Sequence, residues 1–313
     1  INEFVEEAIA SYKKNYPDTP VLVDDIKKYS GQDFLKKIKL KPGELDILDG
    51  SPPCSAFSVA GKREKGWDKT KNYSDGKTVE NIEDLFLEFI RVAKDIKPKV
   101  IVAENVKGIT FGEATKKLNE FVKAFENIGY YVTYKVLNAA DFGVAQGRER
   151  TIFICVREDV ADAIGLSFLN LAGIFPAEFG YQISMEDAIE DIENDPEQVK
   201  ELKDFYEGSF QKKFLDPIPF RPHRHMKPSD PQFRDWNPKA SCFNMIRPCP
   251  TMPCPTLTQQ GQKKGLSGVF HYADNRKLTI LELKRLMSLP EDYELTGSFD
   301  QQAERIGRMV APK

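Results

Sequence analysis

The sequence predicts an α/β fold, in which helices cover both faces of a parallel β-sheet, together with a smaller domain of irregular structure. Three observations support this prediction. Short apolar runs that end at turn residues alternate with helical patterns through the first half of the 313-residue chain. The hydrophobic fraction of 41% suffices for a buried core and excludes a disordered chain. Past about residue 160 the alternation stops, and prolines become frequent.

Four apolar runs are predicted to be strands, and they cover residues 20–23, 45–48, 99–103 and 151–156. Apolar residues recur at helical spacing over 82–96 and over 118–128, where Lys97-Pro98 and Gly129 end the two patterns. A further helix is predicted over 278–287. Because strands alternate with helices, we expect a parallel sheet that binds its ligands where the strands end.

Charge is distributed unevenly along the chain, although its net charge is only −3. Residues 178–208 hold eleven acids and two lysines, a net charge of −9, whereas residues 211–264 hold ten Lys/Arg and three acids, a net charge of +7. Ten of the twenty prolines lie between Pro217 and Pro255, which predicts loops there. We interpret the acidic stretch as a solvated face and the basic stretch as a candidate surface for a polyanion.

The cysteine content indicates a reducing compartment, because five widely spread cysteines do not form a disulfide scaffold. No run approaches eighteen apolar residues, so no membrane span is predicted. We therefore expect a cytoplasmic protein, with a monomer as the default state. A zinc module built from Cys249, Cys254 and His271 is a weak alternative, since the usual second cysteine pair is missing, and no metal is expected.

Two reactive side chains directly follow predicted strands. Cys54 comes after the strand at 45–48, and Pro52 and Pro53 stiffen the backbone before its sulfur. It is either a nucleophile or a small buried hydrophobic residue. Glu104 follows the strand at 99–103 and is either a proton donor or a carboxylate bonded to backbone amides.

A third segment, Gln146-Gly147-Arg148-Glu149-Arg150, leads into the strand at 151–156. Alternation along a strand predicts that Arg148 and Arg150 share one face. Two guanidinium groups on one face can bind phosphate or polarise a carbonyl. A surface ion-pair cluster is the alternative.

In this order, the three segments resemble the motifs of the cytosine-5 DNA methyltransferase family. The resemblance continues through Arg247-Pro248, Pro255-Thr256-Leu257-Thr258, Lys277-Leu278-Thr279, Leu289-Pro290-Glu291-Asp292-Tyr293 and Arg305-Ile306-Gly307-Arg308-Met309-Val310. It omits roughly 158–245, which corresponds to the variable target-recognition region of that family. It implies a Rossmann-like, S-adenosylmethionine-dependent methyltransferase sheet. The implied organisation is a catalytic domain at 1–175, a target-recognition domain at 176–274, a hinge at 275–302 and a return to the catalytic domain at 303–313.

The resemblance implies four catalytic residues in a DNA (cytosine-5-)-methyltransferase. Cys54 would add to carbon 6 of a flipped-out cytosine, which activates carbon 5 for the methyl group. Glu104 would contact nitrogen 3, and Arg150 the carbonyl oxygen of the base. Arg148 would be a neighbour in the active site.

S-adenosylmethionine is the implied cofactor and S-adenosylhomocysteine its product. The residues implied in binding it are Glu3, Phe4, Asp25, Ile26, Pro53, Leu85, Arg308, Met309 and Val310. Two features depart from the family pattern. The family usually has Gly-Asn-Ser-Val where this chain has Gly307-Arg308-Met309-Val310. A Phe-x-Gly-x-Gly loop that cradles the cofactor precedes the matching region in the family, so we expect it before Ile1 in the intact protein.

Double-stranded DNA is the implied partner, in a bacterial or phage-encoded system that can include a cognate restriction endonuclease. The candidate DNA contacts are Ser58, Arg221, Arg224, Lys227, Arg234, Lys239, Arg247, Lys263 and Lys264. Two alternatives remain open, a tRNA cytosine-5 methyltransferase and a catalytically silent DNA-binding relative. The long region between Val156 and Arg247 favours DNA over tRNA, and the four retained catalytic residues favour an enzyme.

Overall fold

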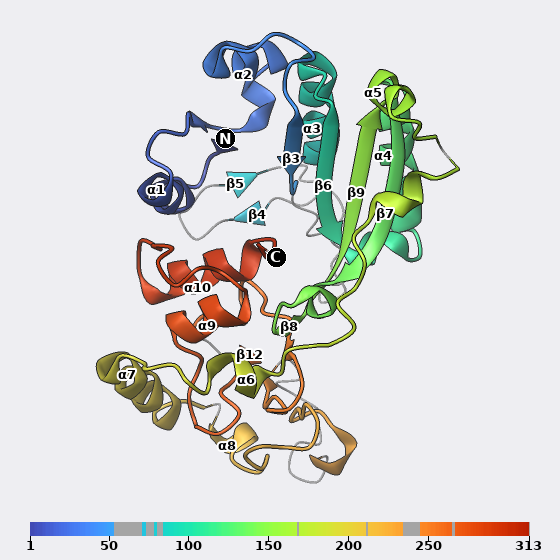
Figure 1. The fold of residues 1–313 in the computed structure, drawn as a ribbon. Helices are drawn as coiled ribbons and strands as arrows, with labels where there is room; N and C mark the ends of the chain where they lie inside the picture. The colour runs from blue at the N-terminus through green and yellow to red at the C-terminus, as the bar shows by residue number, and fades with distance from the viewer. Residues whose placement is uncertain are drawn as a thin grey trace. The chain divides into compact units, whose positions relative to one another are not determined.

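The computed structural model describes residues 1–52, 71–72, 78–79, 84–167, 169–210, 212–233, 245–264 and 267–312. These residues form two compact units (Figure 1). Unit 1 comprises residues 1–137 and 149–177, and unit 2 comprises residues 138–148 and 178–313. The four-part domain organisation expected from the sequence stays a prediction.

The central sheet of unit 1 has the strand order β3-β6-β9-β7. These strands are β3 (Ile47–Gly50), β6 (Val100–Val106), β9 (Glu149–Arg157) and β7 (Tyr130–Asn138). β3 runs parallel to β6, with Gly50 opposite Ala103, but β9 runs antiparallel to β6, with Arg150 opposite Val106. The expectation of a parallel sheet is therefore wrong for β9. The connection from β7 to β9 holds one 3-10 turn, η4 (Ala139–Phe142), and the two-residue β8 (Gln146–Gly147), whereas a parallel return needs a longer crossover.

A second, two-stranded parallel sheet lies in the N-terminal part of unit 1. β1 (Asn2–Glu3) pairs with β2 (Leu22–Val23), and α1 (Glu6–Asn15) lies between them in the chain. After β2 come η1 (Ile26–Lys28) and α2 (Gly31–Ile38). A capping box of Ser30 and Asp33 starts α2. Gly31 is required there, because a Cβ at this position would lie 2.3 Å from the Cβ of Asp95. A further antiparallel pair is β4 (Lys71–Asn72) with β5 (Thr78–Val79).

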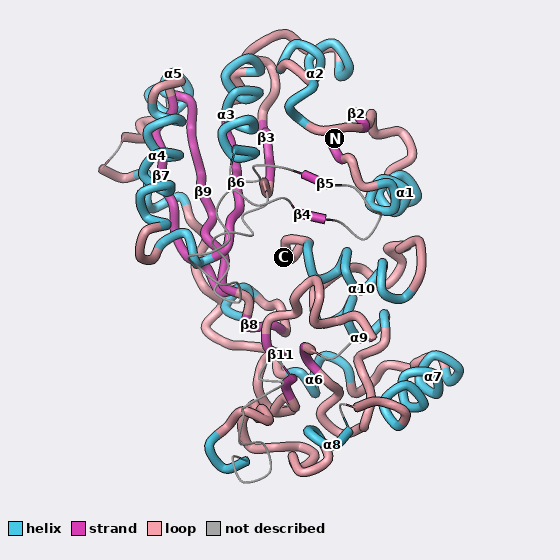
Figure 2. The backbone as a smooth tube through the Cα atoms, turned by 180° about the vertical axis from the view of Figure 1, so that it is seen from behind, coloured by secondary structure: helices cyan, strands magenta, loops and turns pink. Residues whose placement is uncertain are grey.

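Helices pack on both faces of the central sheet, as the sequence predicts. On one face, α3 (Asp84–Ile96) and α4 (Ala114–Glu126) run alongside the strands, and η3 (Lys107–Thr110) precedes α4 (Figure 2). The rings of Phe86 on α3 and Phe121 on α4 stack at 4.1 Å. On the other face, α5 (Glu158–Ala163) and η5 (Leu171–Ile174) pack against alternate residues of β9 and β7.

Unit 2 contains very short strands and short helices, as its prolines predict. β8 pairs with β11 (Cys254–Pro255), and β10 (Met245–Ile246) pairs with β12 (Gly268–Val269), both in parallel. Its helical elements are α6 (Met185–Ile189), α7 (Pro196–Glu207), α8 (Lys212–Leu215), η6 (Pro231–Phe233), α9 (Ile280–Leu286) and α10 (Phe299–Arg308). The predicted helix over 278–287 is α9, which a capping box of Thr279 and Glu282 starts.

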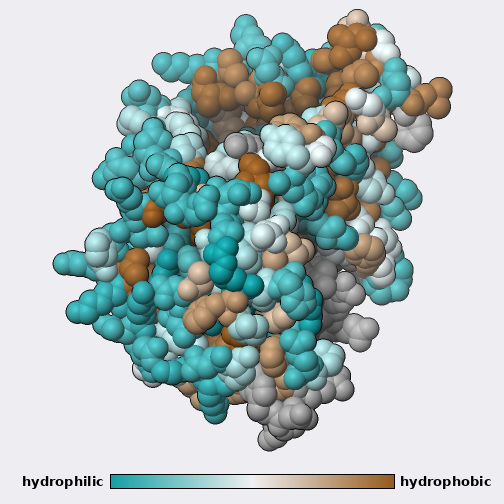
Figure 3. Space-filling model, turned by 60° about the horizontal axis from the view of Figure 1, so that its bottom comes forward, coloured by the Kyte–Doolittle hydropathy of each residue, from teal (hydrophilic) through white to brown (hydrophobic). Residues whose placement is uncertain are grey.

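In the view of Figure 3, hydrophobic side chains gather along the upper part, and the rest of the face is mostly hydrophilic with scattered hydrophobic side chains. Within the described ranges, no helix combines the length and apolar character needed to cross a membrane. Two aromatic clusters and one aliphatic cluster supply the main buried contacts of the two units.

The stacked phenylalanines predict a stability effect in unit 1. Phe121→Ala should lower the free energy of unfolding by about 3–5 kcal/mol, because a fully buried ring is replaced by a cavity. Urea unfolding monitored by circular dichroism measures this loss. Phe111→Ala is the matched control, since Phe111 is 47% exposed, and it should cost less than about 1 kcal/mol. Equal losses in the two variants would contradict the assigned core.

Candidate functional site

Three chain segments meet at one edge of the central sheet. The parallel strands β3 and β6 both end there, at Gly50 and Val106. Because β9 runs in the opposite direction, it begins at this same edge, with Arg150 opposite Val106. The described chain leaves β3 at Ser51-Pro52. Pro53, Cys54 and Ser58, which the sequence assigns to the site, lie outside the described residues.

Glu104 and Arg150 form an ion pair at this edge. Arg150 Nε lies 2.8 Å from Glu104 Oε1, and the two side chains are only 18% and 16% exposed. A second bond, from Arg150 Nη1 to the Glu149 carbonyl oxygen at 2.7 Å, fixes the other end of the guanidinium. Burial lowers the pKa of Arg150, and the Glu104 carboxylate opposes this shift. The pair places an acceptor and a donor group side by side, an arrangement suited to a polar heterocycle.

The predicted nucleoside-binding residues of unit 1 also come together. Glu3 ends β1, and Asp25 follows β2, so both carboxylates lie at the same edge of a parallel pair. Glu3 Oε1 accepts hydrogen bonds from the amides of Phe4 and Val5 at 2.8 and 2.9 Å, which leaves Oε2 for another donor.

Next to these carboxylates, Phe4, Ile26 and Leu85 belong to one hydrophobic cluster. Asp25 Oδ1 accepts from the Lys27 amide at 3.0 Å and thereby caps η1. An apolar wall beside fixed carboxylates suits a base and a ribose. The carboxylate acceptors and the apolar wall therefore fit the nucleoside part of S-adenosylmethionine.

Arg148 has a different environment from the one the sequence suggested. β9 begins at Glu149, so strand alternation does not extend to Arg148. Its guanidinium donates to the carbonyl oxygens of Leu257 at 2.9 Å, Gly307 at 3.2 Å and Met309 at 2.9 Å, all in unit 2. Arg148 is 3% exposed. In this structure it therefore joins three backbone segments, and a catalytic role for it stays a prediction.

Gln146 is a buried residue of this segment whose structural role the sequence did not predict. Its Oε1 accepts from the Leu257 amide at 3.0 Å, and Thr256 Oγ1 donates to the Gly147 carbonyl at 2.6 Å. Together with the β8–β11 pairing, these bonds fix the Gln-x-Arg segment against Pro255-Thr256-Leu257. Both segments match family motifs, which was the signal in the sequence that they matter. Their distance along the chain does not predict that they are in contact.

The residues predicted around the methionine end of the cofactor lie at the end of α10. Arg308 is the last helical residue, Met309 is extended, and Val310 follows without regular secondary structure. The Arg308 side chain turns back along the helix and pairs with Glu304. Val310 is 42% exposed. Glu304 was not singled out in the sequence, although its spacing of four residues from Arg308 is typical of helical ion pairs.

Most predicted DNA contacts that the structure describes are paired with acids of unit 2. Two of them pair with the acidic stretch 178–208, Arg221 with Glu186 and Lys264 with Glu201. Arg224 lies 3.3 Å from Asp230, and Lys263 lies 2.6 Å from Glu304. The acidic stretch is thus not only a solvated face, since part of its charge neutralises the basic stretch.

The remaining DNA candidates differ in exposure. Lys227 is exposed. Arg247 is fully buried and donates to the carbonyl oxygens of His271 and Asp274, both at 3.0 Å. A DNA contact by Arg247 would have to replace these bonds. Arg234 and Lys239 lie outside the described residues.

The zinc alternative gains no support from the described part of the chain, in which no three His, Cys, Asp or Glu side chains are arranged to hold a metal. Cys254 is buried in the core of unit 2, and burial raises the pKa of its thiol. Cys249 Sγ lies 3.3 Å from Thr251 Oγ1. His271 stacks on Tyr272 at 4.6 Å.

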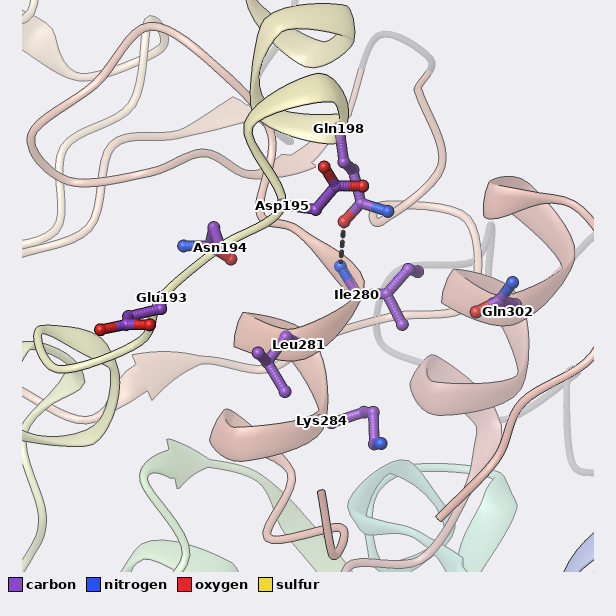
Figure 4. A pocket seen from close by; sticks show the side chains of 8 residues that line it. All are labelled: Glu193, Asn194, Asp195, Gln198, Ile280, Leu281, Lys284 and Gln302. Carbon is purple, nitrogen blue, oxygen red and sulfur yellow. Dashed lines mark hydrogen bonds between the residues drawn. The ribbon is translucent and has the colours of Figure 1, made fainter. Parts of the chain in front are cut away.

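A pocket in unit 2 lies between the start of α7 and the helices α9 and α10 (Figure 4). Gln198 Oε1 accepts from the Ile280 amide at 3.0 Å across it. Lys284 donates to the Glu291 carbonyl. These bonds attach α7 and the turn at Glu291 to α9. None of the predicted site residues lines the pocket.

Comparison with known proteins gives a family match over the whole chain. The model of the family described as C-5 cytosine-specific DNA methylase matches residues 1–313. The type II methyltransferase M1.HphI of Haemophilus parahaemolyticus is 31% identical over 310 residues, which is 96% of this chain and 74% of that protein. M.NgoPII of Neisseria gonorrhoeae is 27% identical over 306 residues, covering 94% of this chain and 79% of its own length.

Solved structures share the fold. A chain described as a DNA modification methyltransferase encoded within a prophage (E. coli) superposes with a TM-score of 0.67 at 17% identity, covering 99% of this chain and 87% of that one. DNMT2 of Spodoptera frugiperda superposes with a TM-score of 0.58 at 18% identity, covering 99% and 87%. The α/β methyltransferase fold expected from the sequence is thereby confirmed.

The three carbonyl bonds of Arg148 predict that lysine cannot replace it. Arg148→Lys should lower the free energy of unfolding by about 2–4 kcal/mol, because an ammonium cannot reach three carbonyl groups in this geometry. Arg285→Lys is the control, since Arg285 forms ion pairs with Asp191 and Glu291 at the surface, and it should cost less than about 1 kcal/mol. Thermal unfolding of both variants measures these losses. An Arg148→Lys variant as stable as the control would contradict the role of Arg148 in joining these backbone segments.

The environment of His271 predicts a loss of stability in acid. Burial lowers the pKa of His271 to about 4, with Glu282 acting in the opposite direction. This pKa lies below the pKa of histidine in the unfolded chain, about 6.5. The free energy of unfolding is therefore at its full value above about pH 6.5 and declines by about 1.4 kcal/mol per pH unit as the pH falls toward 4.

Urea unfolding at pH 7, 6 and 5 measures this effect. His271→Gln should show a shallower pH dependence than the wild type, since glutamine can still accept from the Ala273 amide, as His271 Nδ1 does at 3.1 Å. His223→Gln removes an exposed histidine and should keep the wild-type slope. Parallel pH profiles for the wild type and His271→Gln would contradict the assignment.

Proposed function

Because the chain belongs to the C-5 cytosine-specific DNA methylase family, we propose that it methylates carbon 5 of cytosine in one short sequence of double-stranded DNA, as a DNA (cytosine-5-)-methyltransferase. The observation that carries this proposal is the Glu104–Arg150 ion pair at the edge where β3 and β6 end and β9 begins. It supplies an acceptor and donors for a flipped-out base. In the sequence, Cys54 comes two residues after Pro52, the last described residue that follows β3.

Cys54 acts as the nucleophile in the proposed reaction. Its thiolate adds to carbon 6 of cytosine, and the ring electrons that move to carbon 5 make that carbon nucleophilic. Bound S-adenosylmethionine supplies the methyl group that carbon 5 takes up. The carbon 5 proton then leaves to a base, and the thiolate is expelled from carbon 6, which restores the ring and the free cysteine.

Glu104 and Arg150 orient the base and stabilise its charge. A hydrogen bond or proton from Glu104 to nitrogen 3 offsets the negative charge that grows on the ring as the thiolate adds. Arg150 donates to the carbonyl oxygen at carbon 2. Their mutual bond in the free protein holds both side chains in place before substrate arrives, which reduces reorganisation in the reaction.

The residues proposed to bind the cofactor are those that the family resemblance implies. Glu3 would hold the ribose hydroxyls, with Phe4, Asp25, Ile26 and Leu85 around the adenine. In unit 2, Met309, Val310 and the backbone at Arg308 are proposed to contact the methionine part of the cofactor, and Pro53 is a further proposed contact. No metal is needed for this chemistry, because the thiolate and the sulfonium methyl group supply nucleophile and electrophile.

DNA is favoured over tRNA as the substrate by the relatives at 27–31% identity, which are type II methyltransferases. The silent-relative alternative is disfavoured by the Glu104–Arg150 geometry, which a protein that only binds DNA does not require. We place the enzyme in the cytoplasm as a monomer, in a setting that can include a cognate restriction endonuclease.

The test compares the full-length protein with its Cys54→Ala variant on unmethylated genomic DNA, with labelled S-adenosylmethionine, followed by bisulfite sequencing. We expect 5-methylcytosine at one short sequence, and none with the variant. Glu104→Gln should lower kcat about 100- to 1000-fold, since it keeps the shape but loses the proton and charge. Glu149→Gln is its control, because Glu149 is a neighbouring acid that pairs with Lys107 at the surface.

The outcomes separate the candidate functions. Label in tRNA and not in DNA would replace the DNA assignment by the tRNA alternative. DNA binding without label in either nucleic acid would favour the silent relative. Equal rates for Glu104→Gln and Glu149→Gln would remove Glu104 from the mechanism.

A further inference from the structure

Glu304 is a buried carboxylate on α10 that no part of the proposed chemistry uses. It is 1% exposed. Three cations surround it. Lys263 Nζ lies 2.6 Å from Oε2, Arg305 Nη2 lies 3.2 Å from Oε1, and Arg308 Nη2 also bonds Oε1. Burial alone would raise the pKa of Glu304, but Lys263 and the two arginines outweigh it, so the pKa lies below its usual value.

Glu304 thus neutralises part of a cluster with three positive charges. Removing its charge would leave three cations close together and largely buried, which is unfavourable. Arg308 is the last residue of α10, one helical turn after Glu304. Its pairing with Glu304 draws the guanidinium back along the helix.

The backbone around Arg308 is fixed independently of Glu304. Arg148 donates to the carbonyl oxygens of Gly307 and Met309, on the two sides of Arg308. Gly307 also packs closely on Thr258 and Gln259, because a Cβ there would lie 2.6 Å from their backbone atoms. With the backbone held, the side chain of Arg308 is the remaining variable at this position.

The segment that carries Lys263 is likewise docked on α10 by other contacts. The Lys264 amide donates to Asp300 Oδ1 at 2.9 Å, and Lys277 Nζ donates to the Gly261 carbonyl at 2.7 Å. Loss of the Lys263–Glu304 pair therefore leaves the segment attached. The effect of Glu304 on Arg308 can be separated from its effect on the fold.

We propose that Glu304 is a positioning residue for S-adenosylmethionine binding, which holds the Arg308 guanidinium back along α10 and away from the space beside Met309 and Val310. This rests on the proposed function, in which Met309, Val310 and the backbone at Arg308 contact the methionine part of the cofactor. Arginine stands here where the family usually has asparagine, a much shorter side chain. Glu304, one helical turn earlier, makes the longer side chain compatible with the site.

A double-mutant cycle tests the proposal in the full-length protein. The variants are Glu304→Gln, Arg308→Asn and the double variant, each checked for folding by thermal unfolding. Calorimetry with S-adenosylhomocysteine measures binding without turnover. Glu304→Gln should weaken binding about 10-fold, because the released guanidinium enters the site, whereas the same substitution should have no further effect once Arg308 is asparagine. The double variant should bind like Arg308→Asn.

Kinetics give a second readout. Glu304→Gln should raise KM for S-adenosylmethionine about 10-fold and change kcat by less than about 3-fold, since only cofactor binding is affected. Glu201→Gln is the matched control. It removes the ion pair of the neighbouring Lys264, at a carboxylate that is 60% exposed, and should bind S-adenosylhomocysteine like the wild type.

Three results would overturn the inference. Wild-type affinity in Glu304→Gln would show that the carboxylate does not position Arg308. Equal weakening in Glu304→Gln and the double variant would assign Glu304 to the fold alone. Loss of binding in Arg308→Asn would mean that Arg308 itself contacts the cofactor. Failure of the proposed function gives a different result, because the wild-type protein would then bind no S-adenosylhomocysteine.

Discussion

The antiparallel pairing of β6 and β9 is the constraint on which the candidate site depends. In a fully parallel sheet the segment before β9 would lie at the opposite edge from the ends of β3 and β6. Reversal of β9 sets Glu104 opposite Ile152 and Val106 opposite Arg150, so that the Glu104 and Arg150 side chains share a face. The ion pair between them is a diagonal contact of this ladder. The connection between β7 and β9 is too short for a crossover helix, and this is why Arg150 lies at the same sheet edge as Glu104.

Charge in unit 2 is balanced internally before any polyanion binds. The acidic stretch supplies Glu186 and Glu201 to Arg221 and Lys264. A phosphate that contacts either cation must compete with a carboxylate already in place. Because exposed ion pairs contribute little to stability, replacement of the carboxylate by a phosphate costs little. The acids weaken DNA binding by the same amount whatever the DNA sequence is. Sequence discrimination would then depend more on contacts to base edges than on net charge.

Local patterns in the sequence predicted the elements of unit 1 well, because apolar periodicity reports burial and burial defines strands and helices there. The predicted runs at 45–48, 99–103 and 151–156 are β3, β6 and β9. Strand direction was missed, since periodicity is the same for either direction. The pairing of Arg150 with Glu104 and the carbonyl bonds of Arg148 were also missed. They join residues far apart in the chain, and only the topology brings them together.

Unit 2 shows what replaces a sheet when strands are two residues long. Buried carbonyl groups still need donors, and extended ladders are not available to supply them. Arg148, Arg247 and Lys277 provide these donors, each to at least two backbone carbonyls. Burying a cation is costly, but several strong bonds per side chain offset the cost. Glu304 follows the same principle with the charges reversed, because this buried carboxylate is offset by three other cations, Lys263, Arg305 and Arg308.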